Sequence, residues 1–150
     1  MRIALAAVHL LALGIGLGAI WARARSFGAV PDTLAALRRG FTADSWWGVA
    51  AILWIGSGLW RLLGSVEKPT PYYVHNTYFM AKMAGLILIL ILEIWPMLTL
   101  IKWRGAASRG TLSFAAIAPR SHRIARISYI QATIVVVMVV LAVTMARGYH

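Results

Sequence analysis

The sequence contains no cysteine. This absence excludes a framework of disulfide bonds, a metal site built on thiolates, and covalent attachment of a c-type haem through a C-x-x-C-H motif. Any haem that the chain binds is therefore held non-covalently.

Acidic residues are also scarce. Only 4 residues are Asp or Glu, against 15 Lys or Arg, which gives a formal net charge of +11. A charge of this sign can indicate a nucleic-acid-binding protein. Here the basic residues flank apolar segments and lie on no polar domain, so we expect no nucleic-acid partner.

Apolar residues dominate instead, at 61% of the chain, and its mean hydropathy is +0.76. They gather in four runs, at about 3–22, 45–63, 77–101 and 124–146. Each run approaches or exceeds the roughly 20 residues that cross a bilayer as a helix. A signal peptide is the competing interpretation of the first run, but that run is long and further spans follow. We predict an all-α membrane protein in which residues 1–150 form one bundle of four transmembrane helices.

The basic residues divide unevenly between the two sides of the membrane. The termini and the middle loop share one side and hold Arg2, Arg61, Lys68 and Arg147. The first and third loops hold Arg23, Arg25, Arg38, Arg39, Lys102, Arg104, Arg109, Arg120, Arg123 and Arg126. Because cytoplasmic loops are enriched in Lys and Arg, we place the first and third loops in the cytoplasm and both termini outside it. The expected location is a bacterial inner membrane.

The first loop carries a helical pattern of its own. Pro31-Asp32-Thr33 is a helix start signal, and Leu34, Leu37 and Phe41 follow at helical spacing. This pattern predicts a short amphipathic helix that lies on the cytoplasmic membrane surface between spans one and two.

Four side chains are predicted to meet near the outer face. His9 and Lys82 lie at a similar depth, roughly 8–9 Å in at 1.5 Å per residue. Arg61 and Arg147 end spans two and four. Such a group suits an anionic ligand, for example a carboxylate or phosphate. The alternative is that both arginines snorkel to the interface and that His9 is a hydrogen-bonded packing residue.

A second polar level lies nearer the cytoplasm. Glu93 comes 11 residues after Lys82, on nearly the same face of span three, so it should point into the bundle. Gln131 in span four has a similar depth, and a Glu93–Gln131 hydrogen bond is the simplest explanation of both residues. A proton-relay role for Glu93 is the alternative. Asp44 either caps the start of span two or pairs with a cytoplasmic arginine.

Small residues offer faces for close helix packing. They include the Gly14-x-x-x-Gly18 motif of span one, and Gly48, Gly56 and Gly58 of span two. Such faces bring helices together in membranes. We expect them to serve contacts within the bundle or in a homo-oligomer.

Several short motifs together resemble an uncharacterised bacterial family of four-helix inner-membrane proteins. The motifs are Thr42-Ala43-Asp44, Gly58 to Arg61, Tyr78-Phe79-Met80-Ala81-Lys82 and Met145-Ala146-Arg147-Gly148, together with the early His9. The resemblance covers essentially the whole chain. It implies the four-helix fold and no established activity.

More distantly, the layout is similar to HemJ-type protoporphyrinogen oxidases, which are linked to b-type haem and porphyrin oxidation. The likeness rests on His9, on Arg38 or Arg39, and on Lys82. It implies a redox protein that binds haem b or a porphyrin. A second intramembrane histidine is missing here, so the resemblance does not carry over ligation of the iron by two histidines.

Three functional hypotheses follow. In the first, His9 is the axial ligand of a haem, and Arg61, Lys82 and Arg147 hold its propionates. The second ligand is then His75, Met80 or Met83, and the sequence does not choose among them. In the second hypothesis the protein binds an anion or a lipid headgroup without a redox centre. In the third, the polar residues only lock the helices together. No hydrolase constellation and no H-x-x-x-H spacing is present, and catalytic residues stay unknown.

Overall fold

A computed structural model describes residues 2–64 and 76–147. These residues form four helices: α1 (Arg2–Gly28), α2 (Leu34–Leu63), α4 (Thr77–Ser108) and α5 (Phe114–Ala146). All four are long and apolar enough to cross a membrane. The described residues form no strand, so the predicted all-α class with four membrane spans is confirmed.

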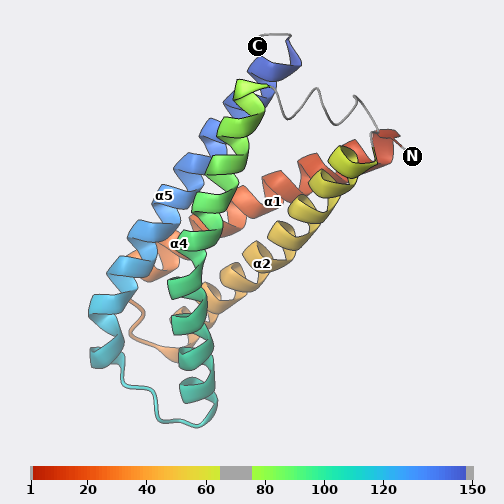
Figure 1. Cartoon of the computed structure of the whole chain (residues 1–150). Helices are drawn as coiled ribbons and strands as arrows, with labels where there is room; N and C mark the ends of the chain where they lie inside the picture. The colour runs from red at the N-terminus through yellow and green to blue at the C-terminus, as the bar shows by residue number, and fades with distance from the viewer. Residues whose placement is uncertain (1, 65–75, 148–150) are drawn as a thin grey trace.

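The helices pack as two pairs. Helix α1 packs along α2, helix α4 packs along α5, and α1 also contacts α5 to join the pairs. The backbones of α2 and α4 approach each other at few points, and side-chain hydrogen bonds join these two helices instead. In Figure 1 the two pairs lie close together near the α1–α2 and α4–α5 turns and spread apart toward the N-terminus and the end of α5. The predicted outer level of polar residues lies at this open end.

The first helix connection differs from the prediction. Thr33 does start a helix, because its side chain accepts a hydrogen bond from the Ala36 N–H at 3.2 Å. This helix is α2 itself, however, which continues without a break to Leu63. The prediction of a separate surface helix between spans one and two was therefore wrong. Leu37 and Phe41 are buried in a core cluster with Phe27, so their apolar face meets protein instead of lipid.

Two apolar clusters stack along the bundle, with polar residues between them. The cluster nearer the open end includes Ile20, Trp47, Ile89 and Val135. The cluster nearer the turns includes Phe27, Leu37, Leu100 and Ile124. Between the two clusters, along their own helices, lie five polar residues: Arg23, Ser128 and Gln131, which are buried, and Asp44 and Glu93, which are partly buried. These residues form a polar layer between two apolar ones.

The glycines that allow close helix packing are not the ones that the sequence motif predicted. No atom lies within 4 Å of a Cβ built on Gly14, Gly18, Gly48 or Gly56, so none of these four makes a close contact with another described helix. The closest approach is at Gly40, where such a Cβ would lie 2.7 Å from the Phe27 ring. A homo-oligomer formed through the exposed glycines stays a prediction.

Candidate functional site: a basic pocket and a buried charge cluster

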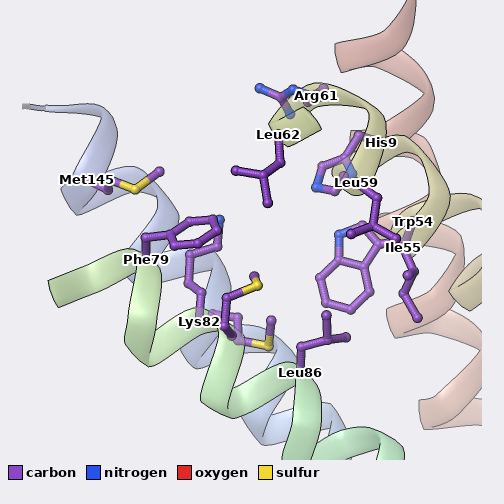
Figure 2. Close-up of a pocket in the computed structure, with 13 residues that line it drawn as sticks. His9, Trp54, Ile55, Leu59, Arg61, Leu62, Phe79, Lys82, Leu86 and Met145 are labelled. Carbon is purple, nitrogen blue, oxygen red and sulfur yellow. The ribbon is translucent and has the colours of Figure 1, made fainter. Parts of the chain in front are cut away.

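A pocket opens between the two helix pairs at their open end (Figure 2). It comprises two cavities of about 150 and 500 Å³ that share part of their lining. The shared residues come from all four helices: His9, Trp54, Arg61, Lys82, Met138 and Met145. The structure therefore brings together three of the four predicted outer residues.

The larger cavity also reaches the lipid-facing surface. Leu10 of α1 and Val143 of α5 both line it, and both are largely exposed on the outside of the bundle. In a membrane, apolar side chains at this position contact acyl chains. The pocket is thus accessible sideways, from the bilayer, as well as between the helix pairs.

His9 is held in a defined orientation. Its Nδ1 lies 2.9 Å from the Ser57 hydroxyl oxygen, and that hydroxyl lies 2.6 Å from the Leu53 carbonyl oxygen. Because a carbonyl can only accept, the hydroxyl proton goes to Leu53, and Ser57 accepts the Nδ1–H of His9. In its neutral form the His9 ring therefore carries its proton on Nδ1 and its lone pair on Nε2. Gly58 provides the space for this ring, since a Cβ there would lie 3.1 Å from His9 Cε1.

Trp54 lies beside His9 on the same wall of the pocket. The two ring centroids are 6.0 Å apart, and Trp54 is only 9% exposed. Its indole Nε1 is buried and has no hydrogen-bond partner among the described residues. An unsatisfied buried donor costs roughly 1–3 kcal/mol. A ligand with an acceptor atom would remove this cost.

The basic side chains face this wall. Lys82 reaches into the pocket from α4, opposite His9 and Trp54, and Arg61 lies near the pocket mouth (Figure 2). No ion pair joins Lys82 to a carboxylate within residues 2–64 and 76–147. Among the described residues, the remaining lining of the two cavities is apolar and contains no carboxylate. The described lining of the pocket therefore combines basic side chains with apolar walls.

Other predicted pocket residues lie elsewhere. Arg147 is exposed at the end of α5 and lines neither cavity. Among the proposed second haem ligands, Met80 is exposed and outside both linings, whereas Met83 lines the smaller cavity. His75 lies outside the described residues.

A cluster of charged side chains lies one level further along the bundle, and Arg23 is its centre. Arg23 is fully buried. Its guanidinium donates to both oxygens of Glu93, at 2.6 and 2.8 Å, and to Asp44 at 2.8 Å. It also donates to Gln131 and Ser128, each at 2.9 Å. One side chain of α1 thus binds polar groups on the three other helices.

Glu93 and Gln131 form the predicted pair. The Gln131 amide donates to Glu93 at 2.8 Å and to the Ile89 carbonyl oxygen at 3.2 Å. The Trp47 indole donates to the same Glu93 oxygen at 3.1 Å. Glu93 therefore faces the bundle interior, with hydrogen bonds to all three neighbouring helices.

Asp44 pairs with arginines and caps no helix. Helix α2 begins ten residues earlier, so the N-cap interpretation was wrong. The alternative, pairing with an arginine, is confirmed: one oxygen accepts from Arg23 and the other from Arg104 at 3.0 Å. Two arginines thus balance two carboxylates in this cluster.

Sequence reasoning placed Arg23 in a cytoplasmic loop, and this was wrong. The prediction ended span one at residue 22, where the apolar run stops, but α1 continues to Gly28. Ile20, Arg23 and Phe27 share one helix face, and the outer two are buried. Arg23 lies on this apolar face, at the depth of the Asp44 and Glu93 carboxylates. These two observations could have identified Arg23 as their partner.

The two polar layers are separated in depth. His9 and Arg23 are 14 residues apart on α1, or roughly 21 Å along the helix. Every charged group of the Arg23 cluster already has an opposite charge. Within the described part of the chain, no group of three or more His, Asp or Glu could hold a metal ion. The Arg23 cluster thus joins the helices to one another, and the pocket is the candidate binding site.

Comparison with known proteins identifies the family. The family model described as "Predicted membrane protein (DUF2214)" matches residues 1–150, so the chain belongs to this family of membrane proteins. No curated protein matches the chain, and no solved structure matches it. The comparisons give no support to the likeness to HemJ-type proteins.

Proposed function

We propose that this member of the DUF2214 family binds an amphipathic anion in the pocket between its two helix pairs. The observation that carries the proposal is Lys82, which reaches into an apolar cavity beside Arg61, with no carboxylate among the described residues of the lining. An uncompensated ammonium at membrane depth costs several kcal/mol unless it is hydrated or paired. A ligand carboxylate or phosphate supplies the missing charge, and the apolar walls accommodate the rest of the molecule.

The access route supports the same class of ligand. A cavity whose rim includes lipid-facing residues of α1 and α5 admits molecules that already reside in the bilayer. Anionic membrane lipids combine a charged head with apolar tails. A lipid headgroup is therefore the favoured anion.

Binding of lipid by the purified protein tests this proposal. Native mass spectrometry in detergent should show tighter binding of phosphatidylglycerol than of zwitterionic phosphatidylcholine. The variant Lys82→Met should lose most of this preference, because the head then lacks its ammonium partner. Lys102→Met is the matched control, since Lys102 is exposed at the far end of the same helix. Equal binding of both lipids by the native protein would reject the proposal.

A second candidate, haem b with a redox role, is favoured by the environment of His9. Histidines that ligate metals usually donate their other ring N–H to a fixed acceptor, as His9 donates to Ser57. The thioethers of Met83, Met138 and Met145 line the same cavities and offer a second ligand. Arg61 and Lys82 would hold the propionates. The haem would supply one-electron chemistry.

Absorbance spectra distinguish the two candidates. Protein with bound haem should show a Soret band, either as purified or after addition of hemin. His9→Ala should abolish this band, and Lys82→Ala should weaken retention of the pigment. Colourless protein that takes up no hemin rejects haem and leaves the anion proposal intact.

We also propose that the pocket faces the outer leaflet of a bacterial inner membrane. With Arg23 assigned to the bundle interior, the first and third connections and the helix ends beside them still hold more basic residues than the opposite side. The positive-inside rule then places the α1–α2 and α4–α5 turns in the cytoplasm.

A further inference from the structure

The indole N–H of Trp54 is a second group of the pocket, besides the Lys82 ammonium, that a ligand can satisfy directly. It is the single buried side-chain nitrogen or oxygen in residues 2–64 and 76–147 that lacks a hydrogen-bond partner. By contrast, Trp47, one level deeper on the same helix, donates its indole N–H to Glu93. A buried indole normally finds such an acceptor, because burial removes the hydrogen bond that water would supply.

The direction of this donor ties it to the pocket. Trp54 lines both cavities, and in Figure 2 the nitrogen edge of its indole points toward the open centre of the pocket. The side chain is held by its burial and by the neighbouring His9 ring. The donor is therefore pre-oriented toward any occupant.

Trp54 and Arg61 lie at two different depths along the pocket. They are seven residues apart on α2, which is two helical turns and roughly 10 Å along the axis. A compact anion such as free phosphate that binds near Arg61 does not extend to the indole. A ligand that satisfies both groups carries an anionic head and, further down, a second oxygen that accepts a hydrogen bond.

We infer that Trp54 recognises an uncharged carbonyl oxygen of the ligand, so that the occupant is an anionic ester-linked phospholipid whose phosphate lies at Lys82 and Arg61. This inference rests on the proposed function and narrows its ligand class. Glycerophospholipids have ester carbonyls directly below the phosphate, at the boundary between head and tails. Ether-linked lipids have the same head and tails without a carbonyl.

The test compares phosphatidylglycerol with its dialkyl ether analogue, using native mass spectrometry of the full chain in detergent. The native protein should bind the ester lipid about five- to tenfold more tightly, which is the usual effect of one hydrogen bond. In Trp54→Phe the ring remains but the N–H is lost, so the two lipids should bind equally. Trp60→Phe is the control, because Trp60 lies on the same helix, is largely exposed and lines neither cavity.

The possible results distinguish a failure of the inference about Trp54 from a failure of the proposed anion binding. If the native protein binds both lipids equally but still prefers them to phosphatidylcholine, the inference about Trp54 is overturned and the anion pocket stands. If it shows no preference for either anionic lipid, the proposed function fails as well. If glycerol phosphate alone binds as tightly as the whole lipid, the ligand is a free anion and the inference is overturned. The ratio measured on the native protein decides the question even if Trp54→Phe does not fold.

Discussion

Replacement of Arg23 by methionine is the most informative test of what holds the bundle together. The change keeps an unbranched apolar chain of similar length and removes the guanidinium. Five hydrogen bonds disappear, and they reach Asp44, Glu93, Gln131 and Ser128 on the three other helices. Two carboxylates then remain with only Arg104 to balance them.

The expected loss is large because the partners stay behind. Removal of one member of a buried ion pair typically costs about 3–5 kcal/mol, since the remaining charge is left uncompensated. We therefore expect Arg23→Met to lower the free energy of unfolding by about that amount. The measurement is reversible unfolding in mixed micelles with increasing SDS, followed by tryptophan fluorescence.

Two further variants make this result interpretable. Arg25→Met removes an exposed arginine two residues away and should leave stability nearly unchanged. The double variant Arg23→Met with Glu93→Gln should recover part of the loss, because the carboxylate left without its closest cation becomes a neutral amide. A loss of less than about 1 kcal/mol for Arg23→Met would refute the reasoning, since the Arg23 cluster would then contribute little to the stability of the bundle.

The remaining predictions concern packing, the Glu93 site and topology. Gly40→Ala should destabilise the protein by roughly 1–3 kcal/mol, because its Cβ would lie 2.7 Å from the Phe27 ring, whereas Gly48→Ala meets no atom within 4 Å and should be neutral or slightly stabilising in the same unfolding assay. Glu93→Ala should destabilise by more than Glu93→Gln, which retains hydrogen-bonding atoms for Arg23 and Trp47. Alkaline phosphatase fused to the C-terminus should be active, and a fusion in the α1–α2 turn inactive; the opposite pattern contradicts the proposed orientation.

Apolar length and spacing were enough to predict the fold class. Four runs of roughly 20 apolar residues have few alternatives in a bilayer, because every backbone polar group must be satisfied within its own segment. The helix ends were less predictable. Hydropathy stops at residue 22, but helical hydrogen bonding continues to Gly28, since buried partners support the last turns of α1.

Part of the pocket was predictable from residue positions along the helices. Depth along a helix follows from residue counting, which predicted that His9, Lys82 and Arg61 share a pocket. Which side chains share a cavity depends also on helix rotation and divergence. The exposed position of Arg147 and the pocket-facing indole of Trp54 both depend on how the two helix pairs spread apart. A single sequence carries no direct signal for that spread.

Photo-crosslinking with an anionic phospholipid that carries a diazirine near its glycerol backbone tests the central claim most directly. The proposal predicts that peptide mapping finds label on pocket-lining residues such as Trp54, Met83 and Met138. This labelling should fall with excess unlabelled phosphatidylglycerol and in Lys82→Met. Label confined to outward-facing residues such as Ile52 and Ile91, and unchanged by either treatment, would contradict it.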